Sequence, residues 1–174
     1  MNNIDIPFFN GGWSYTQKEM NSLFRFIKYK DDYSILEFGA GDSTHKLWFH
    51  FKKYTKNLSY TVFETDPLYT PLYPEIKTIV YDANDIDSIE IPVGTFDLIL
   101  VDGPNGDKRA KWYSKIRKSV KPGTIILVDD FNHFASFSQE LDKNFQYETL
   151  DHFEIPFVAW GEHSWKIVKV IRTI

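Results

Sequence analysis

Five apolar segments of this 174-residue chain end in glycine or in an acidic residue. In an open α/β sheet the carboxyl ends of parallel strands meet at one edge, and ligands bind in the crevice beside that edge. Carboxylates in such a crevice can accept hydrogen bonds from sugar hydroxyls, bind a hard cation or take up a proton. The residues at these ends are Gly39 and Gly41, Glu64, Asp82, Asp102, and the pair Asp129 and Asp130.

The turn Gly39-Ala40-Gly41 resembles part of a nucleotide-binding fingerprint. A dinucleotide site needs a third glycine where this chain has Thr44, so NAD and a nicotinamide enzyme are disfavoured. The sequence also lacks the glycine and lysine motif of P-loop nucleotidases. A ligand with ribose and adenine but no pyrophosphate fits better, because Glu64, 23 residues after Gly41, is placed to accept hydrogen bonds from two ribose hydroxyls.

These residues resemble a known family. The stretch Glu37–Thr44 (EFGAGDST), the acid Glu64 and the segment Phe96–Asp102 (FDLILVD) are similar to motifs I, II and IV of class I S-adenosylmethionine-dependent methyltransferases. The resemblance implies that S-adenosylmethionine is the cofactor, with the glycines beside its methionine half, Glu64 on its ribose, and Asp82 or Ala83 beside its adenine. The cofactor-binding residues that the resemblance implies are Glu37, Gly39, Ala40, Gly41, Ser43, Thr44, Glu64, Asp82, Ala83 and Asp102.

Three aspartates follow two of the predicted strands, and we expect their carboxylates to converge. Neighbouring strands lie about 4.8 Å apart, and clustered carboxylates repel one another unless protons or a cation offset their charge. Oxygen ligands favour Mg²⁺, which would activate a hydroxyl acceptor and aim its oxygen at the methyl group. We therefore expect Asp102, Asp129 and Asp130 to bind Mg²⁺ or another divalent cation. The pattern VDG…VDD resembles macrocin-type sugar O-methyltransferases, and VDGPNG resembles the glucuronoxylan methyltransferase family.

Three side chains are candidates for the proton transfer that accompanies methylation. Asp102 is the first, as a metal ligand that can also accept a proton. His133 follows the aspartate pair closely enough to reach the same crevice, and histidine is a suitable base near neutral pH. Lys108 is the base-like residue nearest to the position at which macrocin-type enzymes have a histidine, which this chain lacks. The alternatives are that His133 is a solvated loop residue and that Asp129 or Asp130 caps the next helix.

Other features bear on the acceptor. Adenine and cytosine N-methyltransferases of nucleic acids carry [DN]-P-P-[YF] after the fourth strand, and the aromatic is absent from Asp102–Asn105 (DGPN). The basic segment Asp107–Lys121, with Lys108 and Arg109 nearest the crevice, could face an anionic acceptor, although such runs are usually solvated. We expect a sugar or glycan hydroxyl as acceptor; the alternatives are RNA or nucleotide ribose, or a cofactor-binding module without chemistry. The aromatic candidates for stacking on the acceptor are Trp13, Tyr15, Trp112, Phe131 and Trp160, with Trp13 and Trp160 preferred.

Alternating strand and helix patterns must position these residues. They predict a Rossmann-like, doubly wound α/β fold, with a seven-stranded, mostly parallel sheet, an antiparallel C-terminal strand, and a helix between the second and third strands. The spacing of Met20, Leu23 and Ile27 predicts a helix over Ser14–Tyr29, begun by a capping box of Thr16 and Glu19. The other expected helices begin at Asp42 or span Asp107–Val120 and Phe134–Phe145, and the expected strands are Ser34–Gly41, Tyr60–Phe63, Lys77–Tyr81, Phe96–Val101, Thr124–Val128, Tyr147–Glu154 and Ser164–Ile171.

Composition limits the class of protein. The chain has no Cys, which excludes disulfides, thiolate zinc sites and a Cys nucleophile. Its net charge of −4 disfavours a general nucleic-acid binder without excluding one. The sequence shows no secretory pattern and no apolar run near the roughly 20 residues that span a bilayer. We expect one cytoplasmic domain over residues 1–174, with a lid and helix over 1–30 and no membrane contact; a homodimer could complete the acceptor pocket.

Overall fold

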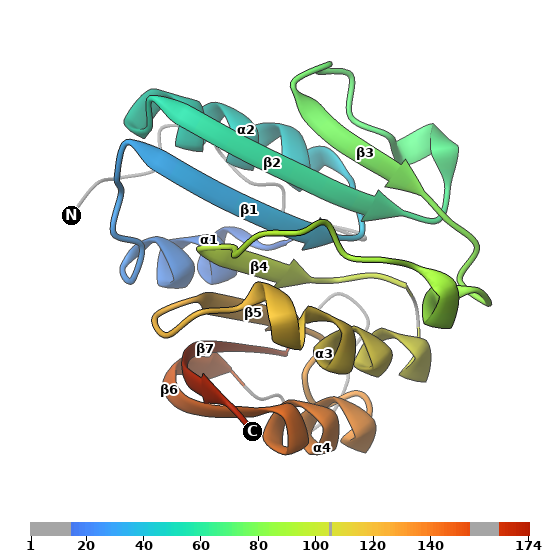
Figure 1. The fold of residues 1–174 in the computed structure, drawn as a ribbon. Coiled ribbons are helices and arrows are strands. Elements are labelled where there is room, and N and C mark those ends of the chain that lie inside the picture. The colour runs from blue at the N-terminus through green and yellow to red at the C-terminus, as the bar shows by residue number, and fades with distance from the viewer. Residues whose placement is uncertain (1–14, 105, 154–163) are drawn as a thin grey trace.

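The computed structural model of the chain describes residues 15–104, 106–153 and 164–174. Its centre is a seven-stranded sheet with the strand order β3-β2-β1-β4-β5-β7-β6 (Figure 1). The strands are parallel except β7, which runs antiparallel to both of its neighbours. The doubly wound α/β fold with a reversed C-terminal strand is thus confirmed. The strands are β1 (Asp32–Phe38), β2 (Asn57–Glu64), β3 (Ile76–Val80), β4 (Leu98–Val101), β5 (Ile125–Asp129), β6 (Phe145–Phe153) and β7 (Trp165–Thr173).

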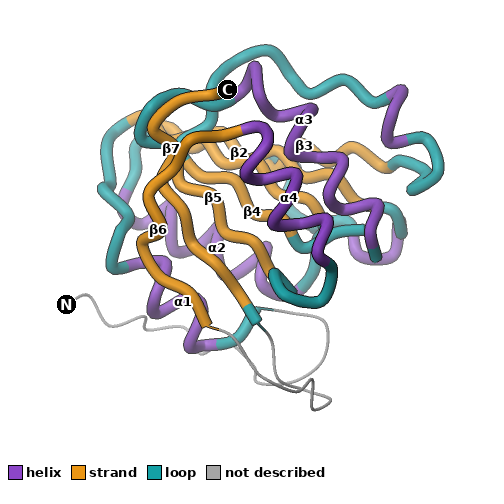
Figure 2. The backbone as a smooth tube through the Cα atoms, turned by 90° about the horizontal axis from the view of Figure 1, so that it is seen from below, coloured by secondary structure: helices purple, strands orange, loops and turns teal. Residues whose placement is uncertain are grey.

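Helices cover both faces of the sheet, with α1 and α2 on one face and α3 and α4 on the other (Figures 1 and 2). Successive side chains of a strand point to opposite faces of the sheet. Ile35 and Leu100 pack beneath α1 and α2, whereas Leu36 and Ile99 pack beneath α3 and α4. All four side chains are fully buried, as expected for strands covered on both sides. The helices are α1 (Gln17–Phe24), α2 (Asp42–Tyr54), α3 (Lys111–Lys115) and α4 (Ala135–Asn144).

The first helix is shorter than predicted but begins as expected. The Thr16 N–H donates to Glu19 Oε2 at 2.6 Å, and the Glu19 N–H donates to Thr16 Oγ1 at 3.3 Å, which confirms the capping box. The helix ends at Phe24, because the N–H groups of Arg25 and Phe26 bond three residues back and close a tight last turn. Its inner face buries Met20 and Leu23 in the layer over β1 and β4, so α1 lies across that part of the sheet.

Two predicted helices take other forms. The connection between β2 and β3 holds only the 3₁₀ turn Pro67–Tyr69, because proline at 67, 71 and 74 prevents a continuous helix. The segment after β4 is divided into the 3₁₀ turn Asp107–Ala110, α3, and the 3₁₀ turn Ile116–Ser119. The buried side chains of this segment include positions 110, 113 and 116, a spacing of three that suits 3₁₀ geometry. A further 3₁₀ turn, Ile86–Ser88, precedes β4.

The register of the parallel strands aligns the residues that follow them. Phe38 pairs with Phe63 on β2 and with Val101 on β4, and Val101 pairs with Val128 on β5. Residues 39, 64, 102 and 129 therefore share one edge of the sheet, as the sequence predicted. Chain order reverses between β1 and β4, which is where open α/β sheets bind ligands. In the described part of the chain, no helix is long and apolar enough to cross a membrane.

Candidate active site

The turns that follow β1 and β4 touch backbone to backbone. Gly39 has a φ of +93°, and a Cβ placed on it would lie 2.9 Å from the Gly103 nitrogen. A Cβ on Gly103 would lie 2.9 Å from the Gly39 Cα. The Gly103 N–H donates to the Phe38 carbonyl at 2.7 Å, and the Gly39 N–H donates to the Phe63 carbonyl at 2.8 Å. Both glycines are therefore needed for the ends of β1 and β4 to meet at the reversal of strand order.

Open space lies beside Gly41, the second glycine of the predicted cofactor turn. Its backbone is extended, with φ at −178°, and its N–H donates to Thr44 Oγ1 at 3.0 Å. A Cβ added at Gly41 would meet no heavy atom within 4 Å. The space adjoins the N-terminus of α2, whose first N–H groups lack partners inside the helix. Ser43 and Thr44, two further predicted cofactor residues, are buried in the first turn of α2.

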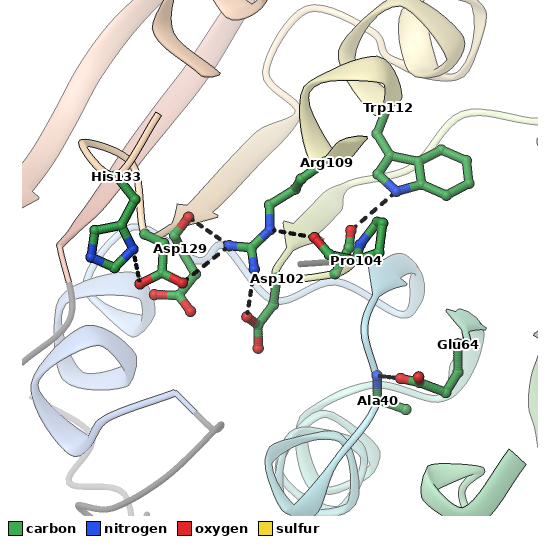
Figure 3. A network of polar contacts seen from close by, with 10 residues as sticks. Ala40, Glu64, Asp102, Pro104, Arg109, Trp112, Asp129 and His133 are labelled. Atoms are coloured by element: carbon green, nitrogen blue, oxygen red, sulfur yellow. Dashed lines mark hydrogen bonds and ion pairs between the residues drawn. The ribbon is translucent and has the colours of Figure 1, made fainter. Parts of the chain in front are cut away.

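Glu64 ends β2 beside this turn, and main-chain donors hold its carboxylate. Oε2 accepts from the Ala40 N–H at 2.5 Å, which links the ends of β1 and β2 (Figure 3). Oε1 accepts from the N–H groups of Thr65 and Asp66 at 2.6 and 2.8 Å. A carboxylate offers about four acceptor positions, so Oε2 retains one for a ligand hydroxyl. The predicted ribose acid thus has a fixed orientation.

Glu37 is fully buried on β1, under the cofactor turn. The Tyr60 hydroxyl donates to its Oε2 at 2.6 Å, whereas Oε1 has no hydrogen-bond partner among the described residues. Burial raises the pKa of Glu37 to about 8, although the hydrogen bond from Tyr60 acts in the opposite direction. Hydrogen bonding with the Thr44 side chain also acts against this rise in pKa, and near neutral pH the buried Glu37 side chain is largely a neutral acid.

The loop after β3 forms the opposite end of the predicted cofactor site. Asp82 accepts from the Asn84 N–H at 2.8 Å and from Asn84 Nδ2 at 2.9 Å, which closes a turn around the half-exposed Ala83. The exposed Lys108 ammonium donates to Asn84 Oδ1 at 2.6 Å. The structure therefore brings Lys108 to the adenine end of the predicted site, and its predicted role as a base gains no support from this position.

The three aspartates predicted to bind a metal lie close together, and the Arg109 side chain lies between them. Arg109 Nη2 lies 3.6 Å from Asp102 Oδ1, and its Nη1 lies 3.5 Å from Asp130 Oδ2 and 3.0 Å from the Asp129 carbonyl (Figure 3). Its Nε donates to the Pro104 carbonyl at 3.2 Å. Burial and the nearby Asp129 carboxylate raise the pKa of Asp102 well above its usual value, and Arg109 partly opposes this.

His133 is paired with Asp130 at the end of β5. Its Nδ1 lies 3.1 Å from Asp130 Oδ1, and the two side chains are 25% and 22% exposed, so a ligand can reach both. Asp130 has a φ of +53°, and it is the only non-glycine residue with positive φ in the described ranges. Such backbone strain is typical of functional sites. A carboxylate that holds one ring nitrogen of a histidine fixes the tautomer and leaves the other nitrogen to take a proton.

The first helix adds two buried groups to this acidic cluster. Glu19 is fully buried, and burial raises its pKa to about 7, with a hydrogen bond to Asp129 among the opposing effects. The Tyr15 hydroxyl is also fully buried, and no described residue accepts or donates a hydrogen bond to it. Burial raises the pKa of Tyr15, and the carboxylates of Asp102 and Glu37 raise it further. The N-terminal end of α1 therefore covers the inner side of the cluster.

Sequence reasoning missed the roles of Glu19 and Arg109. Glu19 was assigned only to the helix cap, although it also adjoins Met20 and Leu23 on the buried face of α1. Arg109 was grouped with the basic face that was expected to meet an anionic acceptor, yet it is 3% exposed. Its spacing of four residues from the buried Tyr113 was the available signal that it faces inward.

The residues present do not fit the expected magnesium site. The Arg109 guanidinium occupies the position between Asp102 and Asp130 where the ion was expected, and its positive charge would repel a second cation there. No group of three or more His, Cys, Asp or Glu in residues 15–104, 106–153 and 164–174 is arranged to hold a metal ion. The three aspartates converge as predicted, but their arrangement provides no support for a bound metal.

The aromatic candidates for stacking on an acceptor are mostly structural. Trp112 is fully buried, stacks on Phe38 with ring centroids 4.1 Å apart, and donates its Nε1–H to the Gly103 carbonyl at 3.1 Å. Phe131 and Tyr15 are buried too. The two preferred candidates, Trp13 and Trp160, lie outside the described residues.

Comparisons with known proteins identify the fold. No protein-family model and no curated protein sequence matches the chain. The structure is similar to that of the N-methyltransferase NodS from Bradyrhizobium japonicum WM9 in complex with S-adenosyl-L-homocysteine, with 13% identity over 88% of this chain and 86% of that one and a TM-score of 0.59. It is also similar to an rRNA methylase from Streptococcus thermophilus (9% identity, 88% and 95% coverage, TM-score 0.58). A third similar structure is Aeropyrum pernix fibrillarin with bound S-adenosyl-L-methionine (16% identity, 87% and 74% coverage, TM-score 0.57).

Proposed function

We propose that this chain, whose fold is that of Rossmann-like methyltransferases, is an S-adenosylmethionine-dependent methyltransferase. The observation that carries the proposal is the open space beside Gly41 at the reversal of strand order. Along the sheet edge, the end of β1 that leads into this turn has Glu64 on one side and Asp102 on the other, as the register of β1, β2 and β4 requires. A ligand with a ribose and a charged amino acid group matches this order of acceptors.

Four residues are proposed to form the cofactor site, and Glu64 among them would hold the cofactor by a hydrogen bond. Glu64 Oε2 would accept a ribose hydroxyl through its remaining acceptor position, and the buried Glu37 would support the turn beside the methionine half. Asp82 and Ala83 would border the adenine. A hydrogen bond to a charged group contributes about 1.5–3 kcal/mol. When bound, S-adenosylmethionine would supply an electrophilic methyl group on its sulfonium sulfur.

We further propose that the acceptor is a hydroxyl, such as that of a sugar or glycan. The Asp130–His133 pair supports this, because it offers an oriented base that a ligand can reach. The second ring nitrogen of His133 would take the hydroxyl proton as the oxygen attacks the methyl group. General-base catalysis of this kind contributes about 10²–10⁴-fold to a rate. No step of the proposal requires magnesium or Lys108.

RNA is the second candidate acceptor, because an rRNA methylase and fibrillarin are among the similar structures. The basic segment after β4 gives this reading less support than the sequence suggested. Lys111 pairs with the Asp87 carboxylate at 2.5 Å, and Lys115 donates to the Asp87 and Ile89 carbonyls at 2.7 and 2.9 Å. These side chains are therefore engaged within the protein.

Calorimetric titration with S-adenosylhomocysteine tests the cofactor, and transfer of a labelled methyl group to sugar or RNA acceptors tests the chemistry. We expect one-to-one binding and labelled sugar. A well-folded protein that binds nothing at millimolar ligand contradicts the proposed function. Labelled RNA, with binding that weakens steeply as salt rises, would replace the sugar reading. Cofactor binding without transfer to either class would indicate a cofactor-binding module without chemistry.

A further inference from the structure

Arg109 joins the two strand ends of the proposed active site. Among the described residues it is the one Lys or Arg side chain that is buried. Its guanidinium contacts four oxygens: the carbonyls of Pro104 and Asp129 and the carboxylates of Asp102 and Asp130. Two of these oxygens belong to the segment after β4, which begins with Asp102, and two belong to the end of β5. One side chain therefore fixes the separation of the two segments.

The oxygens that Arg109 contacts are of the kind that a hard divalent cation would bind. Carboxylate and carbonyl oxygens are the usual ligands of such ions. A guanidinium differs because it is a planar fork that cannot lose its charge and keeps a fixed direction for each N–H. It can therefore offset the repulsion between Asp102 and Asp130 without a metal, and it directs each carboxylate as it does so.

Contact with Arg109 also determines how His133 is presented. Asp130 Oδ2 faces Arg109 at 3.5 Å, and Asp130 Oδ1 faces His133 Nδ1 at 3.1 Å. Each carboxylate oxygen thus has its own partner, and the plane of the carboxylate is set by both. Removal of the guanidinium would take away one of the two charged partners that orient Asp130.

We propose that Arg109 is a positioning residue that takes the place of a divalent cation between Asp102 and Asp130 and fixes the Asp130–His133 pair. The role of the Asp130–His133 pair as a base rests on the proposed function, whereas the replacement of a divalent cation by the Arg109 guanidinium does not. The proposal predicts that the native cluster has no room for a metal ion. It also predicts that loss of Arg109 exposes the carboxylates to cations and frees the histidine ring.

Mn²⁺ is the probe, measured by electron paramagnetic resonance on the wild type and on Arg109→Met and Arg109→Lys. We expect the wild type and Arg109→Lys to leave millimolar Mn²⁺ free, and Arg109→Met to bind about one ion per chain. The second substitution Asp102→Asn should abolish that binding. In nuclear magnetic resonance, the His133 ring should show one tautomer in the wild type and a mixture in Arg109→Met.

Two results would overturn the proposal. One is stoichiometric Mn²⁺ binding by the wild type that Asp102→Asn abolishes, which would restore the metal site; this test needs no variant of Arg109. The other is Arg109→Met that folds, as judged by circular dichroism, yet binds no Mn²⁺ and keeps one His133 tautomer. Failure of S-adenosylhomocysteine binding in the wild type would contradict the proposed function alone, because neither readout for Arg109 depends on the cofactor.

Discussion

Replacement of Gly41 by alanine should weaken cofactor binding and leave the fold intact. The backbone at Gly41 is extended, so alanine adopts it without strain, and the added Cβ would meet no protein atom within 4 Å. The gain from a less flexible unfolded chain and the loss of a better helix cap are each below about 1 kcal/mol and oppose each other. The free energy of unfolding should therefore change by less than about 1 kcal/mol.

The same methyl group would occupy space that we assign to the cofactor. An extra methyl group in a filled site costs about 1–3 kcal/mol, and each 1.4 kcal/mol is a tenfold change in affinity. The dissociation constant for S-adenosylhomocysteine, measured by calorimetry, should rise by about 10- to 100-fold. Urea unfolding of the same preparation, without ligand, measures the stability.

Gly123→Ala is the matched control. A Cβ added at Gly123 would also meet open space, but its φ is +93° and it lies just before β5, at the opposite ends of the strands from the cofactor turn. Positive φ costs an L residue about 1–2 kcal/mol, so this variant should lose stability and keep its cofactor affinity. If Gly41→Ala binds S-adenosylhomocysteine as tightly as the wild type, the assignment of the space beside Gly41 is refuted.

Three further predictions concern other parts of the site. Gly103→Ala should lower the free energy of unfolding by about 1–3 kcal/mol in urea, because its Cβ would press on Gly39; stability equal to the wild type would contradict the backbone contact. Because burial raises the pKa of Glu37 to about 8, the folded state holds a proton that the unfolded chain releases above its ordinary pKa near 4.5. Stability should then fall by up to about 1.4 kcal/mol per pH unit as pH rises from about 5 to 8, and thermal unfolding of Glu37→Gln across that range should show a smaller fall. His133→Asn should lower methyl transfer to a sugar by about 10²–10⁴-fold with unchanged S-adenosylhomocysteine affinity, and unchanged transfer would remove His133 as the base.

The sheet could be predicted because its strands are continuous apolar runs bounded by glycine or acidic residues. In a parallel sheet the carboxyl ends of the strands lie at the same edge. Residues 39, 64, 102 and 129 were therefore expected on one edge, and they are found there. The prediction of a helix between β2 and β3 was wrong, because three prolines in that connection prevent a continuous helix despite its apolar residues.

The partners of the acids could not be predicted in the same way. Arg109 stands among lysines, which indicates a solvated segment, and its spacing of four residues from Tyr113 was the one sign that its side chain faces inward. Glu19 lies 83 residues before Asp102 along the chain, and no local pattern indicates that α1 crosses the ends of β4 and β5. Contacts between distant segments decide such roles, and a single sequence does not contain them.

The contact between Gly39 and Gly103 has a consequence for redesign of the protein. Because each glycine leaves no room for a side chain on the other, a library that varies Gly39 or Gly103 will lose stability in most of its members. In the loop after β5, Asp130 and His133 form the proposed base and must be kept, whereas Asn132 between them is exposed. Diversity intended to change acceptor selectivity is therefore best introduced at Asn132, with Asp130, His133 and the two glycines left as they are.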